Sequence, residues 1–231
     1  MIIGRGLLAT AFLSYSNNPN IVIFASGVSN SKNNEQSLFD REESLLRKTI
    51  ESNKEKIIVY FSTCSIYDNS VNTTKYVYHK LKMENIIQEN CSKFYIFRLP
   101  QVVGVTNSPT LIPFLFDSIE KKKNMIISSN STRNIIAIED VSEIVSYIIE
   151  NENNKNEIIN VATPFNTNII EIIKKIEEIL KNRAIYEKED CGIEQSIDIS
   201  KIKNLNKYFK IYNEKYVDDL LESYYQKRES Q

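Results

Sequence analysis

Short apolar runs recur along the chain, and each ends at polar or turn-forming residues. The five runs cover residues 1–3, 21–25, 57–61, 94–97 and 158–161. Runs that are apolar at nearly every position, rather than at alternate positions, are typical of central strands in a parallel sheet that is covered on both faces. The pattern therefore predicts five buried strands.

Segments with helix-like patterns lie between these runs. Residues 7–13 have a helix-forming composition, and Phe39, Leu45, Leu46 and Ile50 lie at roughly helical spacing in a charged segment. Further helices are predicted over residues 75–90, 111–122, 141–151 and 168–181. This alternation predicts an α/β fold with a doubly wound, mostly parallel Rossmann sheet. The weakly patterned tail beyond residue 184 is expected to add one or two strands and a final helix.

The length of 231 residues fits one domain with a modest C-terminal extension better than two full domains. We expect residues 1–231 to form a single Rossmann-type domain. Its nucleotide-binding core is expected mainly in residues 1–110 and 157–165. A small substrate-binding portion is expected mainly in residues 111–156 and 166–231.

Composition argues against several classes of function. Lys and Arg number 29 against 30 Asp and Glu, for a net charge of -1, so the basic excess that nucleic-acid binding needs is missing. The sequence shows no signal-peptide pattern and no run near the roughly 18 apolar residues of a membrane span. Three cysteines without a paired motif suit a reduced, cytoplasmic setting, and one histidine cannot build a zinc site. We expect no nucleic acid, membrane or metal partner.

A glycine-rich turn follows the first apolar run. It reads Gly4-Arg5-Gly6-Leu7-Leu8-Ala9, a GxGxxA sequence between a predicted strand and a predicted helix. The first glycine permits a tight turn, the second lets a pyrophosphate approach the backbone, and the small alanine lets helix and strand pack closely. The start of the helix then faces the anion. The predicted cofactor contacts of the turn are Gly4, Arg5, Gly6, Leu7 and Leu8.

The choice between NAD and NADP stays open. The usual partner of the ribose hydroxyls is an acidic residue at the end of the second strand, but residues 22–27 contain none. Arg5 inside the turn could meet a 2′-phosphate, which would favour NADP. Arg5 fits a solvated surface cation equally well.

Tyr76 and Lys80 are four residues apart, which places them on one face of a helix. A lysine charge beside the phenol would help Tyr76 to pass a proton to a carbonyl oxygen as hydride arrives. Thr63, at the end of the third run, is well placed to hold that oxygen. Tyr78 and Lys82 have the same spacing, and the chain has 13 tyrosines, so spacing alone leaves the pair undecided.

Several strings, taken in chain order, resemble the extended short-chain dehydrogenase/reductase family, the NAD-dependent epimerase/dehydratase group that acts on nucleotide sugars. The glycine turn matches the opening of that family. Residues 61–67 look like its strand with the catalytic Ser or Thr, four residues before a tyrosine. Tyr76, Lys80 and Glu84 match its Tyr-x-x-x-Lys-x-x-x-Glu pattern, which favours Tyr76 over Tyr78.

The resemblance continues to about residue 180. Residues 24–27 resemble the strand near the cofactor, and residues 98–104 the segment whose proline approaches the nicotinamide carboxamide. Residues 133–141 are similar to the stretch that lines the sugar-nucleotide pocket. The resemblance implies NAD or NADP as cofactor and a nucleotide sugar as substrate. The implied catalytic residues are Thr63, Tyr76 and Lys80. Further implied cofactor contacts are Ala25, Ser26, Gly27, Ser62 and Pro100. The implied substrate contacts are Ser65, Gln101 and Arg133.

The sequence also departs from the family pattern. The run at residue 21 comes too early to be the family's fourth strand unless about two strand–helix units are missing. The adenosine half of the cofactor site would then be truncated, so affinity would be weak or a second subunit, as in a homodimer, would complete the site. Cys64 and Ser65 stand where dehydratases of the family carry an Asp-Glu pair, which disfavours 4,6-dehydration. Gln101 replaces the commoner Asn.

Three functions remain as hypotheses. The first is an NAD(P)-dependent reductase of a nucleotide-linked keto-sugar, with Tyr76 as general acid. A nucleotide-sugar C4 epimerase would use the same three catalytic residues, and net consumption of cofactor would distinguish the two. The third is a non-catalytic or regulatory Rossmann protein in which the shortened nucleotide lobe no longer holds cofactor productively.

Overall fold

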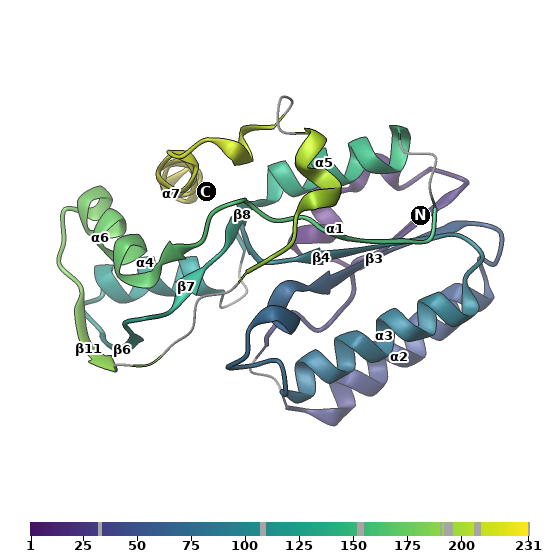
Figure 1. The fold of residues 1–231 in the computed structure, drawn as a ribbon, viewed down its shortest axis with the longest axis horizontal. Coiled ribbons are helices and arrows are strands. Elements are labelled where there is room, and N and C mark those ends of the chain that lie inside the picture. Colours follow the sequence, from purple (N-terminus) through teal and green to yellow (C-terminus); the bar gives the residue numbers. More distant parts are fainter. Residues whose placement is uncertain are drawn as a thin grey trace.

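The computed structural model describes residues 1–31, 34–106, 110–151, 155–189, 191, 196–205 and 209–230. Its central sheet is parallel throughout and has the strand order β1-β2-β3-β4-β9 (Figure 1). The five strands are β1 (Ile2–Ile3), β2 (Ile21–Phe24), β3 (Ile57–Thr63), β4 (Phe94–Leu99) and β9 (Glu157–Asn160). Each coincides with one of the five apolar runs, so the predicted parallel α/β sheet is confirmed.

Helices cover both faces of the sheet (Figure 1). On one face lie α2 (Gln36–Glu51) and α3 (Lys75–Asn90), which pack on Val22, Phe24, Ile58, Tyr60 and Ile96. On the other face lie α1 (Leu7–Ala11), the 3-10 turn Leu13–Tyr15 and α5 (Ile138–Asn151), which pack on the alternate strand residues Ile21, Ile23, Val59, Phe61 and Phe97. All ten strand residues are buried, as expected when successive side chains point to opposite covered faces.

Helix α1 is shorter than its composition predicts. It ends at Ala11, because Phe12 leaves the helical region with φ -108° and ψ 21° and places its fully buried ring in the core. The ring of Phe12 lies 5.2 Å from the ring of Phe61 on the sheet.

The position of β1 at the sheet edge agrees with the expected loss of about two strand–helix units. Within the described ranges, β1 pairs with β2 alone. The chain moves in one direction from β1 to β2 to β3, yet α1 and α2 lie on opposite faces (Figure 1). The two connections therefore have opposite hands, and one of them belongs to the rare left-handed class of parallel crossovers.

The C-terminal elements form a second layer beside the sheet (Figure 1). Strands β6 (Asn124–Ser128) and β11 (Ile185–Glu189) pair in parallel, helix α6 (Ile169–Leu180) packs on β6, and helices α4 (Leu111–Glu120) and α7 (Tyr216–Glu229) pack on α6. Two short ladders link this layer to the sheet. The first joins β5 (Gln101–Val103) to β8 (Ile135–Ala137), and the second joins β7 (Thr132–Arg133) to β10 (Thr167–Asn168).

The tail matches its expectation of a strand and a final helix, and it adds 3-10 turns at Ser200–Leu205 and Lys210–Tyr212. One hydrophobic cluster runs from the sheet into the C-terminal layer. It includes the buried side chains of Phe12, Phe97, Ile136, Ile173 and Leu221. The sheet and the C-terminal helices therefore share a core. Across the described part of the chain, no helix combines the length and apolarity needed to cross a membrane.

Candidate active site at the carboxyl edge of the sheet

The predicted cofactor residues and Thr63 lie at one edge of the sheet because its strands are parallel. The glycine turn follows β1, residues 25–27 follow β2, Thr63 ends β3 and Pro100 follows β4. In open parallel α/β sheets, ligands bind outside the carboxyl ends of the strands. The fold thus brings the predicted cofactor residues and Thr63 to one edge.

The glycine turn is tight on one side and open on the other. Gly4 has φ +138°, and a Cβ there would lie 2.4 Å from the carbonyl oxygen of Ala25, so the turn packs directly on the end of β2. At Gly6, which precedes α1, a Cβ would meet nothing within 4 Å. Arg5 is exposed and contacts no described residue through a hydrogen bond or ion pair. Leu7 packs against Gly104, and Leu8 is partly buried against the core.

These features fit the pyrophosphate of a dinucleotide better than its adenosine. The open space at Gly6 allows a pyrophosphate to approach the backbone, and residues 25–27 lie next to the turn. A pocket of about 390 Å³ lies between β1 and α1 and includes Arg5, Thr10 and Ser16. No strand of the described chain lies beyond β1, so an adenosine placed there would extend over an open edge of the sheet.

Tyr76 and Lys80 share a face of α3, as their spacing predicts. The helix starts after Thr74, whose side chain accepts a hydrogen bond from the Val77 backbone N–H. Tyr76 lies in the first turn and is buried beside residues of α2, and the Lys80 ammonium is 6.0 Å from the centre of its ring. Tyr78 of the alternative pair is 61% exposed. Tyr76 is therefore buried next to Lys80, whereas Tyr78 faces outward.

Thr63 lies at the end of β3, on the strand that also contacts Lys80. Its hydroxyl accepts a hydrogen bond from the Ser65 N–H at 3.0 Å and donates one to the Ser65 hydroxyl at 2.9 Å. The Phe61 carbonyl accepts from the Lys80 ammonium at 3.5 Å. The Ser62 hydroxyl donates to the carboxylate of Glu84 on α3. Lys80 thus contacts β3 at Phe61, two residues before Thr63.

Lys80 is held by a buried carboxylate that sequence analysis did not identify. Glu42 of α2 accepts hydrogen bonds from Lys80 at 3.1 Å and from the Tyr60 hydroxyl at 2.7 Å, and it lies 3.1 Å from the His79 imidazole. Burial raises the pKa of Glu42, but the Lys80 charge and the hydrogen bonds outweigh it and lower the pKa to about 2. Burial, together with Glu42, raises the pKa of Tyr60 well above its usual value. Glu42 is therefore ionised at neutral pH.

A second ion pair fixes the far side of α3. Arg98 of β4 donates to both carboxylate oxygens of Glu84, at 3.0 and 2.6 Å, and its third nitrogen donates to the Tyr67 hydroxyl at 3.1 Å. Burial alone would lower the pKa of Arg98, but the hydrogen bonds to Glu84 and the charge of Glu84 outweigh this effect, so the pKa of Arg98 is raised. Bidentate pairs of this kind fix geometry. The pair ties α3 to the strand that ends just before Pro100.

The predicted substrate residues fall into two groups. Gln101 begins β5, which pairs with β8, and its backbone N–H donates to the Asn134 carbonyl. Arg133 lies one residue before Asn134, is half-buried, and donates to the Thr132 carbonyl at 2.7 Å. Ser65 instead lies beside Thr63. The ladder of β5 and β8 brings Gln101 close to the Arg133 segment, and Ser65 belongs to the end of β3.

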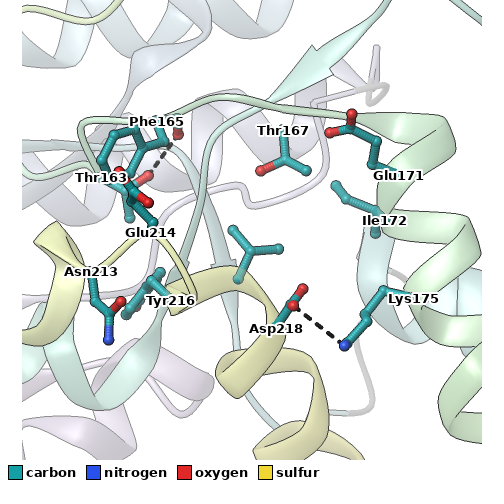
Figure 2. A pocket seen from close by; sticks show the side chains of 11 residues that line it. Thr163, Phe165, Thr167, Glu171, Ile172, Lys175, Asn213, Glu214, Tyr216 and Asp218 are labelled. Atoms are coloured by element: carbon teal, nitrogen blue, oxygen red, sulfur yellow. Dashed lines mark hydrogen bonds and ion pairs between the residues drawn. The ribbon is translucent and has the colours of Figure 1, made fainter.

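A separate pocket of about 220 Å³ lies between α6, α7 and the loop at residues 163–167. Figure 2 shows Lys175 of α6 beside Asp218 of α7, paired at 3.3 Å, with Glu171 further along α6. None of the predicted catalytic, cofactor or substrate residues lines it. The lining of this pocket contains three carboxylates, from Glu171, Glu214 and Asp218, and one lysine, so the charge of the pocket does not suit a diphosphate.

The part of the chain that the structure describes contains no cluster of three or more His, Cys, Asp or Glu residues arranged to hold a metal ion.

Comparison with known proteins gives a consistent result. Residues 9–162 match the model of the NAD dependent epimerase/dehydratase family. Among curated proteins, none matches the sequence significantly. Solved structures match over nearly the whole chain at low identity, and three of them illustrate the range of their activities.

The first is a UDP-N-acetylglucosamine 4-epimerase from Methanobrevibacter ruminantium M1 in complex with UDP-N-acetylmuramic acid, with TM-score 0.73, 18% identity and coverage of 100% of this chain and 83% of the other. The second is a mutant UDP-glucuronic acid 4-epimerase from Bacillus cereus in complex with a fluorinated UDP-sugar and NAD, with TM-score 0.75, 19% identity and coverage of 99% and 81%. The third is a dTDP-glucose 4,6-dehydratase from Bacillus anthracis in complex with NAD, with TM-score 0.72, 14% identity and coverage of 99% and 80%.

Proposed function

The chain belongs to the NAD-dependent epimerase/dehydratase family, and on that premise we propose that it is an NAD(P)-dependent reductase of a nucleotide-linked keto-sugar. The observation that carries the proposal is the position of Tyr76 and Lys80 on one helical face, at the sheet edge that also holds the glycine turn. The similar structures support the choice of ligands, because two of those reported contain NAD and two contain a UDP-sugar.

The cofactor would be held by the glycine turn, with Gly4, Arg5, Gly6, Leu7 and Leu8, and by the strand ends, with Ala25, Ser26, Gly27, Ser62 and Pro100. When bound, its nicotinamide supplies the hydride. Arg5 carries no partner within the described residues and would favour the 2′-phosphate of NADP. The diphosphate of the substrate would bind Arg133 in bidentate fashion, and Ser65 and Gln101 would contact the sugar.

The residues of the chain would control the proton. The Tyr76 hydroxyl donates its proton to the carbonyl oxygen of the sugar as that oxygen gains negative charge. Lys80, 6.0 Å from the Tyr76 ring, stabilises the negative charge left on the phenol. The Thr63 hydroxyl donates to the same oxygen, for which it turns away from Ser65.

The open edge of the sheet favours a reductase over an epimerase. An epimerase must retain its cofactor through an oxidation and a re-reduction, whereas a reductase releases the cofactor after each turnover. With β1 at the edge, the sheet formed by the described residues has no strand beneath the adenosine half of the cofactor, which favours exchange of the cofactor. A dehydratase activity is disfavoured, because Cys64 stands where dehydratases carry an acidic residue. Burial raises the pKa of the Cys64 thiol to about 12, and the thiol donates a hydrogen bond to the Arg98 carbonyl.

A C4 epimerase is the second candidate, and the two 4-epimerases among the reported structures favour it. It would use Thr63, Tyr76 and Lys80 in the same roles. The two activities differ in stoichiometry. A reductase consumes one NAD(P)H for each sugar reduced, and an epimerase converts its substrate with no net consumption.

The test compares Tyr76→Phe with Tyr78→Phe, its exposed neighbour. The chain contains no tryptophan, so nicotinamide fluorescence can report NADH and NADPH binding without an indole background. We expect Tyr76→Phe to keep cofactor affinity within about threefold while turnover of a nucleotide-linked 4-keto-sugar falls by about 10²–10⁴, as loss of a general acid predicts. Tyr78→Phe should keep wild-type turnover. Unchanged turnover in Tyr76→Phe, or no binding of either cofactor at millimolar concentration, would contradict the proposal.

A further inference from the structure

Glu42 is a charged residue on the apolar side of an amphipathic helix. It lies between Phe39 and Leu46 on the buried stripe of α2, and its side chain is fully buried. A buried carboxylate is costly unless its oxygens are paired. Such a position therefore calls for a specific set of partners.

Both oxygens of Glu42 have two partners each. Oε2 accepts from the Val28 backbone N–H at 2.6 Å and lies 3.1 Å from Nε2 of His79. Oε1 accepts from the Tyr60 hydroxyl at 2.7 Å and from Nζ of Lys80 at 3.1 Å. These partners come from the segment after β2, from β3 and from α3, so the carboxylate joins three elements around Lys80.

The Lys80 ammonium is correspondingly fixed. An ammonium has three N–H donors, and Nζ has three acceptors within reach: Glu42 at 3.1 Å, the Tyr60 hydroxyl at 3.0 Å and the Phe61 carbonyl at 3.5 Å. Lys80 is only 3% exposed. A Cβ at Gly27 would lie 2.5 Å from Nζ and 2.9 Å from Oε1 of Glu42, so the glycine leaves the room that this ion pair occupies.

We propose that Glu42 is a positioning residue, whose carboxylate fixes the Lys80 ammonium beside Tyr76 and supplies the counter-charge that keeps this cation buried there. This inference rests on the proposed function, because it acts through the lysine of the proton-transfer step. A lysine side chain has four rotatable bonds, so its charge acts on a neighbour in a defined way only where acceptors hold it. Among the residues that the structure describes, Glu42 is the only acidic side chain that forms a hydrogen bond or ion pair with Lys80.

The structure offers a matched control. Glu43 and Lys82 are neighbours of the buried pair on the same two helices, and they form an ion pair at 2.6 Å with the lysine 57% exposed. Glu43→Gln therefore removes an ion pair between α2 and α3 without touching Lys80. Glu42→Asp keeps the charge at the buried position but withdraws the carboxylate by one methylene.

With enzyme and keto-sugar substrate, we expect Glu42→Asp to lower kcat at least tenfold while KM changes less than threefold, because a misplaced lysine weakens the proton-transfer step rather than substrate binding. Glu43→Gln should keep kcat within twofold. A folded Glu42→Asp variant with wild-type kcat would overturn the proposal.

A second measurement needs no turnover. Urea unfolding of Glu42→Gln, Lys80→Met and the double variant forms a double-mutant cycle. Each single variant leaves one buried charge unpaired and should unfold at lower urea, whereas the double variant should unfold at higher urea than either single variant. Additive effects would overturn the proposal, because they would show that Glu42 does not act on Lys80. An inactive wild-type protein would refute the proposed function instead, and the unfolding cycle alone would then decide whether Glu42 fixes Lys80.

Discussion

Acid should remove the stabilising contribution of Glu42 in a defined pH range. Burial raises the pKa of this carboxyl, but Lys80, His79, Val28 and Tyr60 outweigh it and lower the pKa from 4.5 to about 2. A group whose pKa is lower in the folded state stabilises it above the unfolded-state pKa, and this contribution is lost as the pH falls toward the folded-state pKa. The shift corresponds to about 3 kcal/mol in the free energy of unfolding.

The assay is urea unfolding of the wild-type protein and of Glu42→Gln, followed by circular dichroism at constant ionic strength. Between about pH 5 and about pH 3 the difference in their free energies of unfolding should narrow by about 2 kcal/mol, because the wild-type protein alone loses the contribution of the carboxylate. Histidine and lysine ordinarily titrate above this range. The comparison between the two proteins therefore isolates position 42.

Asp117 provides the control for a surface carboxylate. Hydrogen bonds from Lys121 and Lys123 lower its pKa to about 2 as well, but these groups are exposed to water. The effect of Asp117→Asn should therefore shrink in high salt, whereas the effect of Glu42→Gln should persist. A difference between wild type and Glu42→Gln that stays constant from about pH 5 to about pH 3 would refute the reasoning.

Two further predictions concern the glycine turn and the thiols. Gly4→Ala should destabilise the protein by at least about 2 kcal/mol in thermal unfolding, because of its positive φ and the 2.4 Å approach to the Ala25 carbonyl, whereas Gly6→Ala should unfold at the wild-type temperature and weaken NAD(P)H binding at least tenfold. Equal stability of the two variants would contradict the described turn. Ellman's reagent should modify the exposed Cys191 rapidly and the buried Cys64 only after unfolding, because burial raises the pKa of Cys64 to about 12. Mass spectrometry of the labelled peptides measures the order of modification, and labelling of Cys64 before Cys191 would contradict this prediction.

The elements that the sequence predicts well are those whose signal is local. Helix α3 has the predicted bounds, Lys75–Asn90, because a Thr cap precedes it and an extended residue follows it. Strands β3 and β4 extend two residues past their apolar runs, to Thr63 and Leu99. These added residues still pair, with Ser62 opposite Arg98 and Thr63 opposite Leu99, although the polar side chains of Ser62 and Arg98 end the hydrophobic pattern.

The elements that it does not predict depend on partners far away in the chain. Strand β6 pairs with β11 from Asn124 opposite Ile185 onward, and both Ile126 and Ile185 point outward, 68% and 48% exposed. An apolar residue on an exposed face gives no local sign of a strand. The short strands of the β5–β8 and β7–β10 ladders likewise exist only through their partners.

Glu42 could have been found from the sequence. It lies three residues after Phe39 and four before Leu46, so a carboxylate occupies a position on the stripe that the helical pattern assigns to the core. His79 of α3 is part of the same cluster, because its imidazole lies 3.1 Å from the Glu42 carboxylate. The identity of their partners, on β3 and on the segment after β2, could not be predicted, because it depends on the packing of α2 against the sheet.

The opposite hands of the first two crossovers have a consequence for engineering. A strand–helix pair inserted between α1 and β2 would have to form its strand on the free side of β1, since β2 and β3 occupy the other side. The connection through α1 would then lead from β1 to the new strand, away from β2. The connection from the new strand back to β2 would pass over the face of the sheet that α2 covers, so the two connections would have the same hand. This protein is therefore a suitable host for transplanting a nucleotide lobe from a longer relative, with β1 as the growing end of the sheet.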